Sequence, residues 1–92
     1  MANKLTKNLL NRLTEINDPQ DMHVFLKMVL TPKELEEIPK RIEIFDQLRK
    51  GTPQRKIAKE LNVGIATVTR GSRELQKNKN WRNTEKSRQS LA

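Results

Sequence analysis

Apolar residues in the first third of the chain recur every three or four positions, which is the period of an amphipathic helix. The pattern predicts one helix over residues 4–16 and another over residues 19–30. Asp18 is suited to cap the second helix, and Pro19 to take its first position. The predicted apolar faces consist of Leu5, Leu9, Leu10, Leu13 and Ile16 in the first helix, and of Met22, Phe25, Leu26, Val29 and Leu30 in the second.

The third predicted helix has the clearest start in the sequence. Thr31 and Glu34 can form a capping box, in which each side chain accepts a hydrogen bond from the backbone N–H of the other residue. Pro32 fits the first helical position, and Gly51 is suited to end the helix after Lys50. The positions predicted to be buried are Leu35, Ile38, Ile42, Phe45 and Leu48.

Pro39 lies inside this third helix. A proline there removes one hydrogen bond and crowds the carbonyl four residues earlier, at a cost of about 3 kcal/mol. We therefore expect a kink or a break near residues 37–39. The apolar stripe continues beyond Pro39, which favours a kink over two unrelated helices.

Residues 52–75 predict two short helices joined by a tight turn. Thr52 is expected to cap the first of them and Pro53 to take its first position, while Asn62 tolerates the left-handed conformation of a helix end. The second helix should start around Gly64. Ile57, Ala58, Leu61, Ile65 and Val68 are predicted to face inward, with the small Ala58 where the helices cross. This pattern is typical of a helix-turn-helix, whose second helix enters the major groove of DNA.

Polar residues occupy the predicted outer surface of this motif. Amide, guanidinium and hydroxyl groups of this kind can contact base edges or phosphates. The alternative is an ordinary helical hairpin with a solvated basic face. The residues are Gln54, Arg55 and Lys59 on the first helix, and Thr67, Thr69 and Arg73 on the second.

The net charge of +8 is unevenly distributed along the chain. Residues 1–50 carry nine Lys or Arg and eight Asp or Glu, whereas residues 51–71 carry four against one and residues 72–92 six against two. The excess therefore lies on and after the helix-turn-helix. Such a distribution favours a polyanionic partner, because binding releases counterions. Charge kept for solubility alone gives no reason for the asymmetry.

The composition points to a small aliphatic core. Of 92 residues, 34% are hydrophobic and 3% aromatic, so a monomer would be marginal and a homodimer that shares its core is expected. The absence of cysteine excludes disulfides and thiolate metal sites, and fits a cytoplasmic protein. We expect no membrane segment and no signal peptide. The solitary His23 is expected at the surface; without a Gly-rich phosphate loop, neither an enzyme nor a metal site is predicted.

The segment after Leu75 contains Trp81 and Leu91 but little else to bury. We expect order to about Trp81 and disorder beyond it, with a last short helix anchored on a partner subunit by Trp81 as the alternative. The chain then divides into a helical dimerisation core at 1–51, a helix-turn-helix at 52–75 and a basic, partly disordered tail at 76–92.

Several of these stretches resemble the tryptophan operon repressor family, over roughly residues 22–75. The resemblance implies an all-α, intertwined helical homodimer, whose two helix-turn-helix units dock in successive major grooves of palindromic operator DNA. It also implies L-tryptophan as a corepressor that sets their spacing, in a bacterial cytoplasmic, nucleoid-associated repressor of tryptophan biosynthesis genes. The stretches are Leu30-Thr31-Pro32-Lys33-Glu34, Lys40-Arg41-Ile42-Glu43-Ile44, Gly51, Gln54-Arg55 and Gly64-Ile65-Ala66-Thr67-Val68-Thr69-Arg70-Gly71-Ser72.

The resemblance also implies roles for individual residues. Arg41 and Arg70 would sandwich the indole ring, with Arg70 and Thr31 also beside the ligand carboxylate. The backbone carbonyls of Met28 and Leu30 from the other subunit would accept from the ammonium, and Ile44 and Gly71 would line the indole slot. Arg55 would read a guanine, and the groove-facing set would be Ile65, Ala66, Thr67 and Thr69, at the helix that starts at Gly64.

Two positions depart from the family pattern. At Phe45 relatives carry a smaller aliphatic residue, and a phenyl ring there could fill the ligand space; at Glu74 they carry a serine that helps hold the ammonium. Arg41 and Arg70 could instead form ion pairs with Glu43, Glu74 or phosphate. Two alternatives therefore stay open: a ligand-independent regulator on the same fold, and a non-specific basic module that binds nucleic acid.

Overall fold

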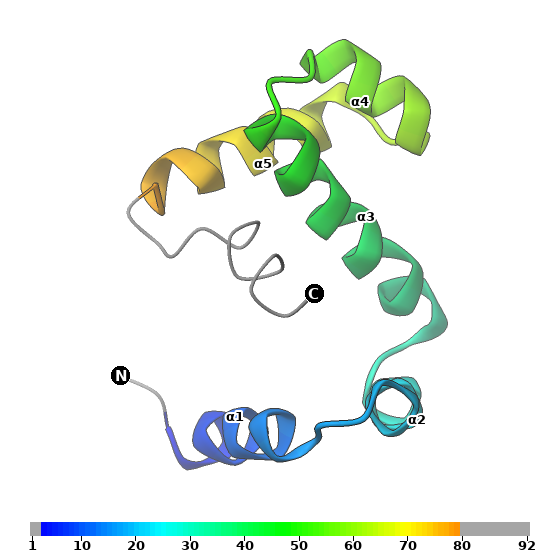
Figure 1. Cartoon of the computed structure of the whole chain (residues 1–92), viewed down its shortest axis with the longest axis vertical. Helices are drawn as coiled ribbons and strands as arrows, with labels where there is room; N and C mark the ends of the chain where they lie inside the picture. The colour runs from blue at the N-terminus through cyan, green and yellow to red at the C-terminus, as the bar shows by residue number, and fades with distance from the viewer. Residues whose placement is uncertain (1–2, 80–92) are drawn as a thin grey trace. The chain divides into compact units, whose positions relative to one another are not determined.

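The computed structural model of the chain describes residues 3–79, and this part is all-α. Within it the chain forms five helices and no strand (Figure 1). They are α1 (Lys4–Glu15), α2 (Pro19–Val29), α3 (Pro32–Arg49), α4 (Gln54–Leu61) and α5 (Ile65–Lys77). The all-α prediction is confirmed. Trp81 and the predicted disorder after it lie outside the described residues.

The chain divides into two compact units, Met1–Glu36 and Glu37–Ala92. The boundary falls inside α3, so the first unit contains α1, α2 and the start of α3. The second contains the rest of α3 together with α4 and α5. The functional division at residues 51 and 75 stays a prediction.

Side-chain caps define the helix starts of the first unit. Asn3 accepts a hydrogen bond from the Thr6 N–H (2.8 Å), and Asp18 accepts one from the Asp21 N–H (3.0 Å) ahead of Pro19. The Asp18–Pro19 prediction is therefore confirmed. The cap at Asn3 was not predicted.

The capping box at the start of α3 is also confirmed. The Thr31 N–H donates to Glu34 Oε1 at 2.8 Å, and the Glu34 N–H donates to Thr31 Oγ1 at 3.1 Å. The bond from the Thr31 backbone, helped by the Thr31 side chain, lowers the pKa of the Glu34 carboxyl from its ordinary value. The side chains of Thr31 and Glu34 are both exposed to solvent.

The first unit has no fully buried apolar side chain among residues 3–36. Neither α1 nor α2 has a buried residue. Leu5 and Met28 are both 78% exposed, and His23 is exposed as expected. The helices of this unit therefore have formed caps but no buried core of their own.

α3 runs through Pro39 without interruption, which excludes the break that was one of the two predicted outcomes, and agrees with the preference for a single helix. A proline removes only its own N–H donor, and its neighbours keep the segment helical; the kink stays a prediction. The predicted buried face is also wrong in part, because Ile38 (37%) and Ile42 (55%) are exposed. α4 and α5 instead cover Ile44, which is 2% exposed.

The core of the second unit joins α3, α4 and α5. Its centre is Ile44, Ile57 and Val68, all exposed by 2% or less, and Figure 1 shows α4 and α5 gathered at the C-terminal end of α3. Asn62 adopts the predicted left-handed conformation (φ 55°) between α4 and α5. The partly buried residues packed around the centre are Leu48, Ala58, Leu61 and Val63.

Three predictions about this unit are wrong: the cap at Thr52, the first helical position at Pro53 and the inward orientation of Ile65. Thr52 does not cap α4, because its hydroxyl donates to Gln47 Oε1 at 2.8 Å; Pro53 holds the cap position and α4 begins at Gln54. Ile65 does not face inward, since it is 48% exposed at the first position of α5. α4 and α5 thus start without a side-chain cap, and the buried Ile57 and Val68 hold them in place.

Candidate DNA-binding surface and ligand pocket

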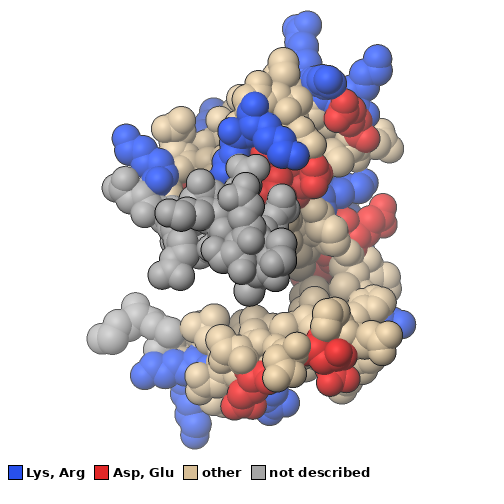
Figure 2. Space-filling view, in the orientation of Figure 1, with Lys and Arg blue, Asp and Glu red and all other residues tan. Residues whose placement is uncertain are grey.

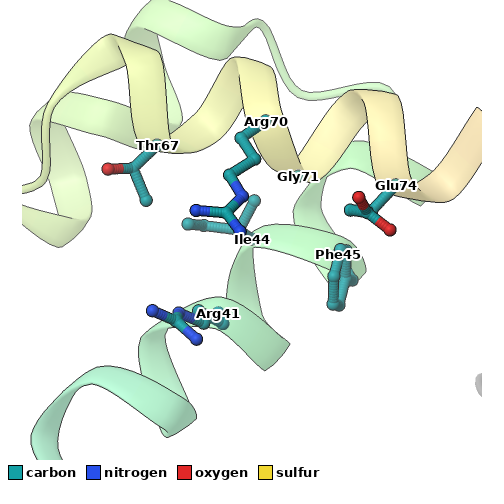
Figure 3. A pocket seen from close by; sticks show the side chains of 7 residues that line it. All are labelled: Arg41, Ile44, Phe45, Thr67, Arg70, Gly71 and Glu74. Atoms are coloured by element: carbon teal, nitrogen blue, oxygen red, sulfur yellow. The ribbon is translucent and has the colours of Figure 1, made fainter. Parts of the chain in front are cut away.

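A pocket of about 370 Å³ lies between α3 and α5. Figure 3 shows its lining side chains approaching from the two helices. Its volume is within the range of small-molecule sites. The structure thus brings together six of the nine residues that the resemblance assigns to the ligand. The lining consists of Arg41, Ile44 and Phe45 from α3, and Thr67, Arg70, Gly71 and Glu74 from α5.

Gly71 allows α5 to approach α3 at the base of this pocket. A Cβ atom at Gly71 would lie 2.9 Å from Ile44 Cγ2 and 3.7 Å from Phe45 Cε1. Ile44 is buried and β-branched, so it cannot easily rotate away. The absence of a side chain at Gly71 therefore sets the distance between the two helices.

Two guanidinium groups face the pocket. In Figure 3 the side chain of Arg70 extends from α5 toward Arg41 on α3. Arg41 forms a long contact of 3.9 Å with Glu37, and because the two side chains are 62% and 43% exposed this pair holds Arg41 only weakly. No ion pair is recorded for Arg70 within residues 3–79. Both cations can therefore turn to an anionic ligand.

The carboxylates near the pocket have other partners than the two arginines. Glu74 lies 3.6 Å from Lys77, and Glu43 accepts a 2.7 Å hydrogen bond from Gln47 Nε2. In the described part of the chain, the alternative pairing of Arg41 and Arg70 with these two carboxylates is not recorded. Glu74 still adds a negative charge to the α5 side of the pocket, one turn beyond Arg70.

Phe45 forms part of the pocket wall. Its side chain is half-buried beside Gly71, and the cavity of about 370 Å³ remains open next to it. Ile44 and Phe45 give the α3 side an apolar character that suits a flat ring. The pocket thus combines an apolar wall with charges of both signs.

The other three predicted ligand residues belong to the first unit. Met28 is 78% exposed, Leu30 follows α2 as its C-terminal cap, and Thr31 is engaged in the capping box. Their contact with a ligand stays a prediction.

Most of the predicted DNA-contacting side chains lie at the surface of α4 and α5. Figure 2 shows Lys and Arg side chains clustered over α4, where Arg55, Lys56 and Lys59 are exposed. Gln54 and Thr69 differ, because both are half-buried and joined by a hydrogen bond. The remaining exposed members of the set are Gly64, Ile65, Ala66, Thr67 and Arg73.

Three side-chain hydrogen bonds were missed by the sequence analysis. Thr69 Oγ1 donates to Gln54 Oε1 at 2.8 Å, across 15 residues of sequence. Gln47 links Glu43 to Thr52, which ties the end of α3 to the segment before α4. The first contact has no local sequence signal, whereas the spacing of Glu43 and Gln47 is that of neighbours on one helix face.

Other kinds of site find no support in the described residues. No group of three or more possible metal ligands comes together between residues 3 and 79. Across the same range, no helix is both long and apolar enough to traverse a bilayer.

Comparison with known proteins adds independent information. The family model described as Trp repressor protein matches residues 4–89. The chain is 48% identical over 59 residues to a Trp operon repressor homolog of Vibrio parahaemolyticus, which covers 63% of this chain and 57% of the relative. It is 51% identical over 53 residues to one of Photobacterium profundum, which covers 56% of this chain and 52% of the relative.

These matches extend over little more than half the length of each curated relative, and no solved structure matches the chain. The family model covers nearly all of the sequence, including the whole of α1 to α5. The chain belongs to the Trp repressor protein family.

Proposed function

We propose that the protein is a sequence-specific DNA-binding repressor of tryptophan biosynthesis genes, with L-tryptophan as corepressor. The observation that carries this proposal is that α5 contributes both to the solvent-exposed surface and to the lining of the pocket. One part of its surface presents Ile65 and Ala66 to solvent, and another, at Thr67, Arg70 and Gly71, lines the pocket against α3. A ligand in the pocket therefore touches the helix that would read DNA.

The chemistry of the pocket suits an aromatic amino acid. Arg41 and Arg70 would stack on the indole ring, and Arg70 would also hold the carboxylate. Ile44 and Phe45 would contact the ring edge, and Glu74 would lie near the ammonium group. Thr31, together with the backbone carbonyls of Met28 and Leu30 from a second subunit, would complete the site.

Dimerisation is the second part of the proposal. Leu5, Leu9, Leu10, Val24 and Met28 are all at least 46% exposed, and α1 and α2 bury nothing within the chain. A second copy that packs on these faces would remove them from water and form an intertwined core. It would also place two copies of α5 on one DNA duplex. Such a protein acts at the nucleoid, in the bacterial cytoplasm.

The ligand would act by shifting a population of conformations. Two helix-turn-helix units must lie about 34 Å apart to enter successive major grooves. Tryptophan between α3 and α5 would favour dimers with that spacing. By linkage, operator DNA should tighten tryptophan binding by the same factor by which tryptophan tightens DNA binding.

Binding-site selection from random DNA, run with and without L-tryptophan, tests the proposal. Selective enrichment of a palindrome that requires tryptophan supports it, and calorimetry of the free protein should give heat on tryptophan addition. Equal enrichment without tryptophan would select the ligand-independent regulator. Binding that ignores sequence and falls steeply with salt would select the non-specific module.

Arg55→Ala tests the DNA-reading surface separately. Arg55 is exposed in the first turn of α4 and is expected to contact one guanine. Its loss should weaken operator binding by about 1–3 kcal/mol and relax preference at one base pair. Lys56→Ala is the matched control, because it removes the same charge from a neighbouring exposed residue, and it should leave base preference unchanged. Unchanged preference in Arg55→Ala would contradict the assigned role.

A further inference from the structure

The hydrogen bond between Thr69 and Gln54 spans the two helices of the helix-turn-helix. Gln54 is the first residue of α4, and Thr69 lies in the second turn of α5. Thr69 Oγ1 donates a hydrogen bond to Gln54 Oε1 at 2.8 Å, and the pair is partly buried. Partial burial strengthens such a bond, because water competes less for either group.

This bond changes what each side chain can offer to DNA. The Thr69 hydroxyl has one proton and has donated it, so it can no longer donate to an acceptor on a base. The Gln54 amide has its oxygen engaged, which fixes the amide plane and leaves the two Nε2 hydrogens as its available groups. Within residues 3–79 no acceptor is recorded for those hydrogens.

The complementary partner of a fixed N–H donor at this place is a phosphate oxygen. Phosphate oxygens accept hydrogen bonds and cannot donate them, so they match the Nε2 hydrogens and not an amide oxygen. The first helix of a helix-turn-helix crosses the DNA backbone, and Gln54 opens that helix beside the exposed cation of Arg55.

We propose that Thr69 is a positioning residue, which aims the Gln54 amide at one backbone phosphate of the operator and does not itself read a base. The inference rests on the proposed DNA-binding function and deepens it. It also changes the role that the family resemblance gives to Thr69 as a groove-facing residue. Thr69 would act on DNA through Gln54.

Methylphosphonate substitution provides the test. A duplex obtained by the binding-site selection above is prepared with single methylphosphonates at successive backbone positions, and dissociation constants are measured by fluorescence anisotropy. For the unsubstituted protein, loss of the phosphate bound by Gln54 should weaken binding about tenfold. Gln54→Ala identifies that phosphate: it is the position where a methylphosphonate no longer raises the dissociation constant of the variant.

Thr69→Val then separates positioning from structure. The penalty at a phosphate is the rise in dissociation constant that a methylphosphonate causes there. Thr69→Val should lose most of the penalty at the phosphate identified with Gln54→Ala and keep the penalties at all other phosphates. Thr69→Ser retains the hydroxyl and should keep the full penalty. If Thr69→Val does not fold, as judged by circular dichroism, Thr69→Ala removes the same hydroxyl and carries the same expectation.

Three results would overturn the inference. One is a hydroxyl-free variant that binds more weakly but keeps the penalty at the Gln54 phosphate, because Thr69 would then serve only the fold. Another is relaxed preference at one base pair when the selection is repeated with that variant, because Thr69 would then read a base. Both leave the proposed function intact. An original protein that prefers no duplex overturns the proposed function, and this inference with it.

Discussion

The two compact units of the chain stabilise their helices in opposite ways. In the first unit each helix start has a side-chain cap, at Asn3, Asp18 and Thr31, yet α1 and α2 bury no residue. In the second unit α4 and α5 start without a side-chain cap, yet Ile57 and Val68 are fully buried. Local hydrogen bonds start the helices of one unit, and tertiary packing holds those of the other.

This difference has a functional counterpart. The second unit contains its own core, so it can present a pocket and a basic surface with defined geometry. The first unit has exposed apolar side chains, among them Leu5, Leu10 and Met28, and within residues 3–36 no fully buried one. We therefore expect substitutions in the second unit to change folding and those in the first to change association.

The largest effect is expected for Ile57→Ala. Ile57 has 0% exposure at the centre of the second core, so its truncation should lower the free energy of unfolding by about 2–5 kcal/mol. Urea denaturation at fixed protein concentration measures the loss. Ile65→Ala is the control, because Ile65 is 48% exposed, and it should cost much less. Equal losses for the two variants would contradict a core centred on Ile57.

Leu9→Glu should break association while the second unit stays folded. Leu9 is 46% exposed in the single chain, so a dimer would bury about half of its side chain in each subunit. Loss of that burial on both copies should cost the dimer roughly 1.5–3 kcal/mol. Sedimentation equilibrium measures the dissociation constant, which should rise about 10- to 100-fold.

Asn11→Glu is the matched control for Leu9→Glu. It introduces the same charge on the opposite side of α1, two residues along the chain, and should leave the dissociation constant nearly unchanged. If both variants dissociate alike, net charge and not the apolar face would govern assembly. If neither does, the apolar face of α1 is not part of the dimer interface.

Gly71→Ser tests the approach of α5 to α3. The new Cβ would meet Ile44 Cγ2 at 2.9 Å, and overpacking of this kind costs about 1–3 kcal/mol. Serine returns only about 0.5 kcal/mol in helix propensity, so a net loss near 1 kcal/mol is expected. Because Ile44 and Phe45 also line the pocket, calorimetry should show weakened tryptophan binding.

Gly64→Ser provides the comparison for Gly71→Ser. No atom lies within 4 Å of a Cβ at Gly64, and serine is favoured at the N-cap that Gly64 occupies. This variant should be at least as stable as the original protein and should bind tryptophan equally well. Unchanged stability in Gly71→Ser would mean that the two helices separate without penalty, contrary to the packing described.

The contrast between the units also explains what the sequence could predict. Asp18 and Thr31 lie within three residues of the groups they bind, so the pattern identified both caps. Burial was harder, because helical period shows which residues share a face and not whether anything covers it. Ile38 and Ile42 share the predicted face of α3, but α4 and α5 cover Ile44 instead.

The candidate site shows the same limit. Arg41 and Arg70 come from separate helices, and only the family resemblance brought them together in advance. The hydrogen bond between Gln54 and Thr69 had no signal at all, because both residues read individually as polar surface positions. Thr52 shows that two hydrogen-bonding roles can compete for one side chain. Its residue type suits a helix cap, yet its hydroxyl donates a hydrogen bond to Gln47 instead.

The smallest effect is expected at Glu34, where the local caps of the first unit can be titrated. The hydrogen bonds from Thr31 lower the pKa of the Glu34 carboxyl in the folded chain, so the folded state favours the ionised form. Its contribution to stability is therefore fully present above the ordinary glutamate pKa of about 4.3 and is lost as the pH falls through the lower folded value. Glu34→Gln keeps a capping side chain but cannot titrate in this range.

The measurement is the thermal midpoint of Glu34→Gln and of the original protein from neutral to acid pH. The original protein should be slightly more stable at neutral pH, and the difference should vanish in acid. Glu36→Gln removes the same charge from an exposed residue two positions along α3, outside the capping box of Thr31 and Glu34, and it controls for net charge. If Glu36→Gln shows the same pH dependence, repulsion among the charges of the whole protein and not the capping box would cause the pH dependence. The claim that local caps stabilise the helices of the first unit would then lose its support.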